Sequence, residues 1–531
     1  MKKSVYLLGT ALLFMLAGCG TSKESSAKPD FITRDESELF SSRDRESGYD
    51  EADAIPIVLE QNTASCSSNK VSVSDSTVTI TDEGTYLLSG SLDGMIIVDA
   101  GKQDKIQLVL DNVSVQCSDN APVYIRQADK VFLTSVSGSE NTLTASGEFT
   151  SLNDSSNIDG AIFSKEDLTL NGSDSLNVRS NLGHGIVSKD SLVITGGSYT
   201  IDAAKHGLSG KDDVSISGGT FQITAGKDGI HGANQDDASL GFLYIADGTF
   251  DITAGDDGLH SDADLTICNG TIRILESYEG IEGKNITIQG GTITVVSSDD
   301  GLNASAGNSE GKETTSPAGP AQADSSLYIL LSGGTLTVNA SGDGLDSNGN
   351  LYITGGEIFV SGSENGGNSA LDYNGEAQIT GGIVAAAGFI DMAQNFSDSS
   401  TQGALLAEFD LQAAETELSL KDSEGNTLIT YTPAKQYNSV VFSHPALTAS
   451  SSYTLQCGDV DTEITMETMI QGKGSEMGTP RRNHEMEKKD MPQQKSGEHL
   501  PEMPEGSQPS DRPEMPEGSQ PSDKQQPSDT L

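Results

Sequence analysis

Two series of oxygen-bearing side chains recur through the middle of this chain, at a spacing that could hold metal ions. The first series follows a short phrase of acidic residue, glycine and apolar residue, which returns after about 22 residues. Its acidic members are Asp228, Asp257, Glu279, Asp300 and Asp343. The second series lies three residues further on, and further carboxylates adjoin both series. The second series is His231, His260, Glu282, Asn303, Asp346 and Asp372, and the adjoining carboxylates are Asp256, Asp262, Asp264 and Asp299.

Carboxylates stacked in this way repel one another. If the repeats stack as neighbouring strands, equivalent residues lie about 4.8 Å apart, and two like charges at that distance repel by roughly 3 kcal/mol at an effective dielectric constant near 20. Only Arg273 and Lys284 lie inside the most acidic stretch. Carboxylate and amide oxygens in irregular shells suit Ca²⁺. We therefore expect calcium ligands among Asp228, Asp256, Asp257, Glu279, Glu282, Asp299, Asp300, Asn303, Asp343, Asp346 and Asp372.

A simpler explanation exists for any single Asp-Gly pair, because both residues are common in tight turns. For one Asp the turn explanation is favoured, and for Asp257, Glu279, Glu282, Asp299 and Asp300 together metal binding is favoured. The four repeat histidines form two pairs by position, which could each bind a transition metal. Since the sequence offers no two further ligands for either pair, polar stacking is the preferred interpretation. These pairs are His184 with His206, and His231 with His260.

The elements that position these residues are short strands. Runs such as Thr292-Ile-Thr-Val295 alternate with period two and end at glycines, which indicates strands with one buried face. A unit of about 22 residues cannot bury its apolar side alone, whereas stacked units share one core. The fold class is therefore all-β, a right-handed parallel β-helix, since parallel crossovers prefer that hand.

The regular helix is expected over residues 151–390, with less regular coils over 63–150 and an antiparallel β cap over 391–470. Longer spacings reveal insertions near 232–241 and 305–325, which should protrude at one corner. The first of these could be a binding loop, whereas the Gly/Ser/Pro-rich second one better fits disorder.

Both ends of the chain are expected to lie outside the fold. Residues 1–19 combine Lys2 and Lys3, a short apolar run and Leu16-Ala-Gly-Cys19, which resembles a bacterial lipoprotein signal lipidated at Cys19. The apolar run is shorter than the roughly 20 residues that span a bilayer. Residues 20–62 are predicted to be a flexible tether and 471–531 a disordered tail. The protein would be lipid-anchored at the extracellular face of the cell membrane, with no other membrane contact.

Composition limits the partners. The 531 residues carry a formal charge of -47, which repels nucleic acid and favours cations. The chain has no tryptophan, and Tyr199, Phe221 and Phe250 fall at inward strand positions, so an uncharged, cellulose-like glycan is the weaker expectation. An acidic glycan would need bridging Ca²⁺. The sequence does not pair Cys66, Cys117, Cys268 or Cys457.

Several phrases resemble bacterial carbohydrate-binding domain-containing proteins over roughly residues 65–460. They include GTYLLSGSL (84–92), DNAPVYIRQADKVFLT (119–134), DGLNAS (300–305), SGDGLDSNGNLYITGGEIFVSG (341–362), ENGGNSALDYNG (364–375) and ITGGIVAAAG (379–388). The resemblance implies a β-helix related in shape to pectate lyases, bound calcium, binding of acidic polysaccharide such as polygalacturonate, and no catalytic role. This chain departs from the family's usual Asp-Gly at His184 and His206.

Two alternatives stay open. A β-helical lyase would need Ca²⁺ and a basic residue, for which Arg273 or Lys284 are the candidates. A hydrolase would need a carboxylate pair such as Asp256/Asp257 or Asp299/Asp300, but adjacent residues on a strand point to opposite faces. A structural surface adhesin would share the same coarse features.

Overall fold

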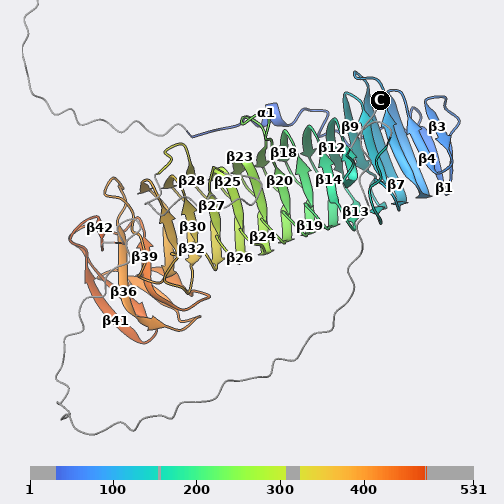
Figure 1. The fold of residues 1–531 in the computed structure, drawn as a ribbon. Helices are drawn as coiled ribbons and strands as arrows, with labels where there is room; N and C mark the ends of the chain where they lie inside the picture. Colours follow the sequence, from blue (N-terminus) through green and yellow to red (C-terminus); the bar gives the residue numbers. More distant parts are fainter. Residues whose placement is uncertain (1–30, 153–156, 307–322, 473, 475–531) are drawn as a thin grey trace, which may run out of the picture. The chain divides into compact units, whose positions relative to one another are not determined.

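The computed structural model describes residues 31–152, 157–306, 323–472 and 474, and its order of elements is almost entirely β. Most strands pair in parallel with strands one coil away, in three continuous series that form the faces of a β-helix. The all-β parallel fold predicted from the repeats is confirmed (Figure 1). Lipidation at Cys19 and nearly the whole tail beyond residue 471 lie outside the described residues, as does most of the second insertion.

The first face carries the recurring acidic phrase. Its strands are β4 (Thr77–Ile80), β6 (Met95–Asp99), β8 (Val123–Gln127), β11 (Gly160–Ser164), β14 (His184–Ser188), β17 (Leu208–Gly210), β20 (Ile230–Gly232), β23 (Leu259–Ile267), β25 (Ile281–Ile288), β27 (Leu302–Ala304), β30 (Leu345–Ser347) and β33 (Leu371–Tyr373). From β14 to β33 the pairing keeps one register, so every coil repeats the same inward and outward positions.

The second face includes the second halves of β23 and β25. Its other strands are β1 (Ile55–Gln61), β5 (Gly84–Asp93), β7 (Lys105–Cys117), β9 (Lys130–Ser135), β12 (Asp167–Gly172), β15 (Ser191–Ile194), β18 (Asp213–Ile216), β21 (Phe242–Ile245), β28 (Tyr328–Leu331), β31 (Asn350–Ile353) and β34 (Ala377–Ile379).

The third face continues from the later residues of β7. Its strands are β10 (Glu140–Ala145), β13 (Ser175–Ser180), β16 (Ser198–Ala203), β19 (Thr220–Ala225), β22 (Thr249–Ala254), β24 (Thr271–Glu276), β26 (Thr292–Ser297), β29 (Thr335–Ala340), β32 (Glu357–Ser361) and β35 (Ile383–Gly388). β19 shows the predicted alternation, with every second residue buried.

The core consists of apolar residues stacked coil upon coil. On the first face Ile186, Leu208, Ile230, Leu259, Ile281, Leu302 and Leu345 lie in register and are fully buried. On the third face the rings of Tyr199, Phe221 and Phe250 are buried and stacked at 5.1 and 4.6 Å between centroids, as their inward positions predicted. The same register that builds this core therefore also aligns the outward side chains.

Both ends of the β-helix have antiparallel strands. At the start β2 (Ala64–Ser65) pairs with β1, and β3 (Val71–Ser74) pairs with β4. At the other end β39 (Tyr437–Ser443) lies between β35 and β36 (Ala404–Gln412), and β42 (Ile470–Gln471) extends β36. A separate antiparallel sheet contains β37 (Leu418–Lys421), β38 (Thr427–Tyr431), β40 (Ser452–Cys457) and β41 (Val460–Thr465). These strands cover the open edge, as the fold prediction required.

The tether expected over residues 20–62 is ordered from residue 31 onward. Residues 31–54, here called the strap, contain the short helix α1 (Glu36–Leu39) and cross the second face before β1 begins (Figure 1). Phe40 is buried against Val193, Phe242 and Tyr244. Asp44 accepts a 2.6 Å hydrogen bond from Thr169 and pairs with Lys130 at 2.8 Å. The prediction missed this because the strap has few apolar residues, and its anchors are mostly polar.

The remaining predictions about chain organisation concern cysteines and membrane contact. Cys66, Cys117, Cys268 and Cys457 are all free thiols in the described residues. No helix in the described part of the chain has the length and apolar character needed to cross a bilayer.

Candidate functional site

Two outward rows run along the first face from coil to coil. The turn ladder precedes each strand, and the carbonyl of each member after His184 accepts the N–H of a glycine one coil back, for example Gly229 N–H to Asp257 O at 2.9 Å. Its members are His184, His206, Asp228, Asp257, Glu279, Asp300, Asp343 and Ser369. The strand ladder lies three residues later in each coil. Its members are Val187, Ser209, His231, His260, Glu282, Asn303, Asp346 and Asp372.

The glycine in each phrase is required by close packing between coils. A Cβ on Gly258 would come within 2.6 Å of Ile274 Cδ1 and 2.7 Å of the Gly280 carbonyl oxygen. At five members of the turn ladder the side chain also has a structural task, because it accepts the backbone N–H of the next member. These members are His184, His206, Asp228, Asp300 and Asp343. Asp300 Oδ1 accepts from Asp343 N–H at 2.6 Å, and His206 Nδ1 accepts from Asp228 N–H at 3.3 Å. Histidine can thus replace aspartate at this position, as it does at His184 and His206.

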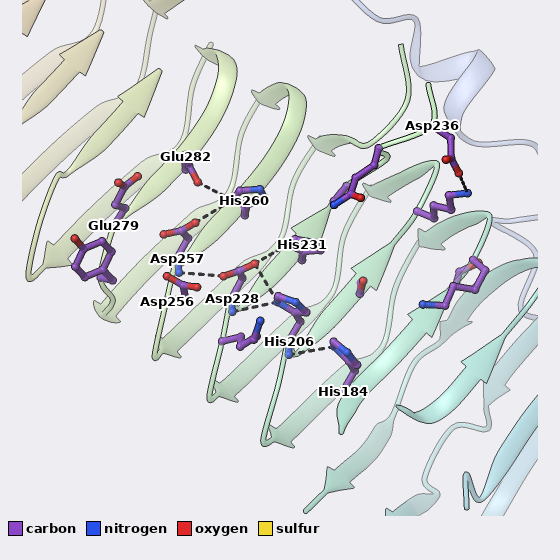
Figure 2. Close-up of a pocket in the computed structure, with 18 residues that line it drawn as sticks. His184, His206, Asp228, His231, Asp236, Asp256, Asp257, His260, Glu279 and Glu282 are labelled. Atoms are coloured by element: carbon purple, nitrogen blue, oxygen red, sulfur yellow. Dashed lines mark hydrogen bonds and ion pairs between the residues drawn. The ribbon is translucent and has the colours of Figure 1, made fainter. Parts of the chain in front are cut away.

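A groove of about 560 Å³ opens over the two ladders (Figure 2). One half contains histidines and lysines, and the other half contains carboxylates. The lining residues include His184, Lys189, His206, Lys211, Lys227, Asp228, His231, Gln235, Asp236, Asp256, Asp257, His260, Tyr278, Glu279 and Glu282. Ala233, Gln235 and Asp236 come from the first insertion, so this loop does reach the site as its position suggested.

The histidines form one continuous stack of rings. The centroid distances are 4.8 Å from His184 to His206, 4.1 Å from His206 to His231 and 4.9 Å from His231 to His260. The sequence placed them in two separate pairs, one on each ladder, and preferred stacking to metal binding. The structure shows the stacking and joins the pairs, because the column crosses from the turn ladder to the strand ladder beside Asp228 (Figure 2).

Asp228 lies between two of these rings. Its Oδ2 is 3.0 Å from His206 Nδ1 and 2.5 Å from His231 Nδ1. Burial alone would raise the pKa of Asp228, but the hydrogen bonds from His206 and His231 outweigh it and hold the pKa well below its usual value. Burial also lowers the pKa of His206 and of His231, against the pull of Asp228. Asp228 is therefore a carboxylate shared between two imidazoles.

His260 marks the change to carboxylates. Its Nδ1 lies 2.9 Å from Asp257 Oδ2 and 2.7 Å from Glu282 Oε2. Burial opposes the charged form, but the hydrogen bonds to Asp257, Asp262 and Glu282 prevail and raise the pKa of His260 well above its usual value. Burial would raise the pKa of Glu282, but His260 lowers it. The charged form is therefore favoured at His260, in contrast to His206 and His231.

The next coils contain carboxylates without enough cations. Asp257, Glu279 and Glu282 each offer an oxygen, and these atoms lie within 4.8 Å of one another. Burial, with the charges of Asp228 and Glu282, raises the pKa of Asp257 to about 8. Burial, with Glu282 and Asp257, raises the pKa of Glu279 to about 9. Without a cation these two groups would hold protons at neutral pH.

The last acidic coils also contain carboxylates without enough cations to pair with them. Asn303 Nδ2 donates to both carboxylate oxygens of Glu279 at 3.0 Å, while the buried Asn303 Oδ1 has no hydrogen-bond partner among the described residues. Burial, with Asp300 and Asp343, raises the pKa of Asp346 well above its usual value. Burial also raises the pKa of Asp343 to about 8, with Asp372 and Asp300 adding to it, and that of Asp300 to about 6, with Asp299 and Asp372 adding to it.

These donors suit a hard divalent cation. They are carboxylate and amide oxygens at neighbouring positions of two ladders, one of them unpaired, which is the ligand type that Ca²⁺ accepts. The structure brings Asp257, Glu279 and Glu282 together and aligns Asn303, Asp346 and Asp372. Asp256 lies exposed at the rim, and a hydrogen bond to Tyr278 occupies Asp299.

The proposed base candidates lie elsewhere. Arg273 forms an ion pair with Asp251 on the third face, and neither Arg273 nor Lys284 is among the lining residues of the groove. Asp256 and Asp257 both line the groove, because they lie in a turn before β23 and not on a strand, so the opposite-face argument does not apply to them.

Sequence reasoning missed the lysines of the groove. Lys189, Lys211 and Lys227 line its histidine half. The repeat itself held the signal, since Lys189 and Lys211 are 22 residues apart, as are Lys205 and Lys227. Tyr278 was also missed. It comes directly before Glu279, in the place that Lys205 and Lys227 hold before His206 and Asp228.

Comparison with known proteins gives a family match over the part of the chain that contains the groove. Residues 74–316 match the model of a family described as "Carbohydrate-binding domain-containing protein". This stretch runs from the first coils through the groove to Asn303. The comparison thus supports a carbohydrate-binding family for the part of the chain that contains the groove.

A relative with the same description comes from Acetivibrio thermocellus (strain ATCC 27405). It is 37% identical over 136 residues, which are 25% of this chain and 47% of the relative, so the chain spans about half the length of the curated relative it matches. A solved structure is described as the polysaccharide lyase-like protein from C. thermocellum, gadolinium derivative. It is 33% identical and covers 45% of this chain and 93% of its own, with a TM-score of 0.40.

Proposed function

We propose that this protein is a non-catalytic, calcium-dependent binding protein for acidic polysaccharides. The observation that carries the proposal is the pair of ladders. In these ladders, carboxylate and amide oxygens outnumber the hydrogen-bond donors and cations that could pair with them. Asn303 Oδ1 is buried and unpaired among the described residues, and Asp346 is a half-buried carboxylate flanked by Asn303 and Asp372. A buried charge or polar atom without a partner is costly.

The residues that would hold calcium form two groups. One is Asp257, Glu279 and Glu282, and the other is Asp300, Asn303, Asp343, Asp346 and Asp372. Calcium supplies positive charge and open coordination positions that a sugar carboxylate can occupy. The protein side chains fix the spacing of those positions at one per coil, about 4.8 Å apart.

The side chains that line the groove support an acidic polysaccharide as the ligand. Lys189, Lys211 and Lys227 line it and can contact anionic sugars directly, and Tyr278 is its only aromatic side chain other than histidine among the lining residues. Neutral glycans usually bind on flat aromatic rings, so a cellulose-like ligand is the weaker candidate. A lipid on Cys19 would hold the protein at the extracellular face of the cell membrane.

Retention on immobilised polygalacturonate, with Ca²⁺ or with EGTA, tests the proposal. We expect retention only with Ca²⁺, and no rise in ultraviolet absorbance from unsaturated product. The double variant Asp257→Asn, Asp300→Asn should lose both calcium and glycan affinity. Asp251→Asn is the matched control, because Asp251 pairs with Arg273 away from the groove. Unchanged calcium stoichiometry in the double variant would contradict the site.

A polysaccharide lyase is the second candidate, and one observation favours it. The groove places Lys189, Lys211 and Lys227 beside a carboxylate-rich half, and a lyase needs a base near bound Ca²⁺. Formation of unsaturated product would establish this activity. Absence of both retention and product would leave a structural adhesin.

A further inference from the structure

We propose that His206, Asp228 and His231 form a site for a transition-metal ion of the zinc class, separate from the calcium ligands. The site has an open coordination position facing the groove. It does not depend on the proposed glycan function. The sequence alone argued against such a site because no further ligands were visible.

The structure supplies the missing ligand. One atom each from His206, Asp228 and His231 can be chosen so that all three lie within 4.8 Å of one another. The two imidazole rings come from different ladders and different coils, and Asp228 lies between them (Figure 2). The side chains of His206, Asp228 and His231 are 12%, 4% and 17% exposed, and all three line the groove.

The donor types select the metal. Two imidazole nitrogens and one carboxylate oxygen suit Zn²⁺ and its neighbours, with a fourth position left open. The group one coil further, Asp257, Glu279 and Glu282, offers oxygens alone and suits Ca²⁺. The two groups are joined by Asp228, Asp257 and His260, whose ligand atoms also lie within 4.8 Å of one another. The groove therefore changes donor chemistry along its length.

One ring nitrogen has two conflicting partners. His206 Nδ1 lies 3.3 Å from the Asp228 backbone N–H, which requires a lone pair on the nitrogen. The same nitrogen lies 3.0 Å from Asp228 Oδ2, which requires a proton on it. A neutral imidazole nitrogen cannot meet both requirements. A cation between Nδ1 and Oδ2 would remove the need for a proton there, because each atom would give a lone pair to the metal. The Asp228 N–H, which lies at the longer distance of 3.3 Å, would then give up Nδ1 as its acceptor.

The open position faces the lysines of the groove. Lys189, Lys211 and Lys227 line the same half of the groove as His206 and His231. These cations would repel a second metal ion and attract an anion. The fourth ligand is therefore expected to be water or an anionic oxygen.

Isothermal titration of the full, tag-free chain with ZnCl₂ tests the site, after chelation and then saturation with Ca²⁺. We expect one Zn²⁺ per chain in the calcium-saturated protein. His206→Gln and His231→Gln should each weaken zinc binding at least about tenfold. Co²⁺ bound to the wild type should give visible absorption bands that both variants lose. His184→Asn is the control, because His184 stacks on His206 outside the ligand group.

The outcomes separate clearly. If the calcium-saturated wild type binds no Zn²⁺, or if both histidine variants bind it as tightly as the wild type, the site is wrong. Should a histidine variant fail to fold by circular dichroism, Asp228→Asn replaces it, since its amide oxygen can still accept the Asp257 N–H that Asp228 Oδ1 accepts at 3.2 Å. It should lose zinc affinity to a similar extent. Glycan retention is unaffected by this result, so failure here leaves the proposed function standing.

Discussion

The two halves of the groove have the same backbone arrangement, but their side chains differ in whether they need a cation. In the nitrogen-rich half, from His184 to His231, aromatic rings stack at 4.1 and 4.8 Å and carry little charge. In the oxygen-rich half, which begins at Asp257, and in the coils beyond the groove as far as Asp372, carboxylates occupy the same ladder positions with raised pKa values. The coil-to-coil hydrogen bonds are alike in both halves. Residue type alone decides which half needs a cation.

The largest expected effect comes from converting the nitrogen-rich half. His206→Asp keeps an acceptor for the Asp228 N–H but places a second carboxylate one coil from Asp228. We expect a loss of roughly 3 kcal/mol in the free energy of unfolding without calcium, from the repulsion of charges about 5 Å apart at an effective dielectric constant near 20. Calcium should restore much of the loss, as urea titrations in EGTA and in CaCl₂ would measure. An equal loss in both conditions would contradict the comparison.

The reverse change, removal of a carboxylate from the oxygen-rich side, tests the same comparison more finely. Asp346→Asn removes a carboxylate that has no ion pair among the described residues. In EGTA we expect the variant to be more stable than the wild type by up to about 3 kcal/mol, because the substitution removes a carboxylate that the charges of Asp300 and Asp343 oppose. In saturating Ca²⁺ it should be less stable, because a ligand is lost. Asp202→Asn, in an exposed pair with Arg179, should change little in either buffer. Destabilisation of Asp346→Asn in EGTA would argue against an uncompensated charge.

A smaller effect is expected from the groove lysines. Lys211→Gln removes one cation near the histidine column, and the side chain pairs with Asp236 at 2.6 Å. We expect a few-fold loss of affinity for polygalacturonate that diminishes in high salt, because exposed ion pairs contribute about 0.2–1 kcal/mol. Surface plasmon resonance at two ionic strengths would measure it. Lys165→Gln, at the equivalent position two coils before Lys211 and outside the lining residues, serves as the control.

The smallest effect concerns the strap, which is anchored beside both halves. Burial would raise the pKa of Asp44, but hydrogen bonds from Lys130, Thr169 and Ser41 lower it below 3.8. The strap's stabilisation is therefore complete above the unfolded pKa of about 3.9 and is lost as the pH falls through the folded pKa. The protection of residues 36–46 from hydrogen exchange, relative to the intrinsic exchange rate at each pH, should fall below pH 4. Equal protection at pH 6 and pH 3 would show that Asp44 does not anchor the strap.

The repeats allowed the fold to be predicted because period-two alternation and a spacing of 22 residues leave few other structures. The ladder memberships followed from the same spacing, and the strand pairing from β14 to β33 reproduces them. The strap could not be predicted in this way. Its contacts, such as Arg34 over the ring of Phe242 at 3.5 Å, join residues some 200 positions apart and leave no periodic signal.

The site was predictable as two rows but not as a groove with two chemistries. Sequence spacing gives a residue's ladder and coil but not the direction in which a long side chain extends. The joining of His206 to His231 across the ladders depends on such directions. Lys189 and Lys211 recur at the same spacing of 22 residues, so the repeat pattern holds their position as well.

Hydrogen exchange of the folded protein, with Ca²⁺ and with EGTA, tests the central claim most directly. The account predicts that amides of β25, β27 and β30 lose protection in EGTA, whereas those of β14 and β17 keep it, because only the oxygen-rich half needs the cation. A metal-free sample with unchanged protection in β25, β27 and β30 would contradict the account.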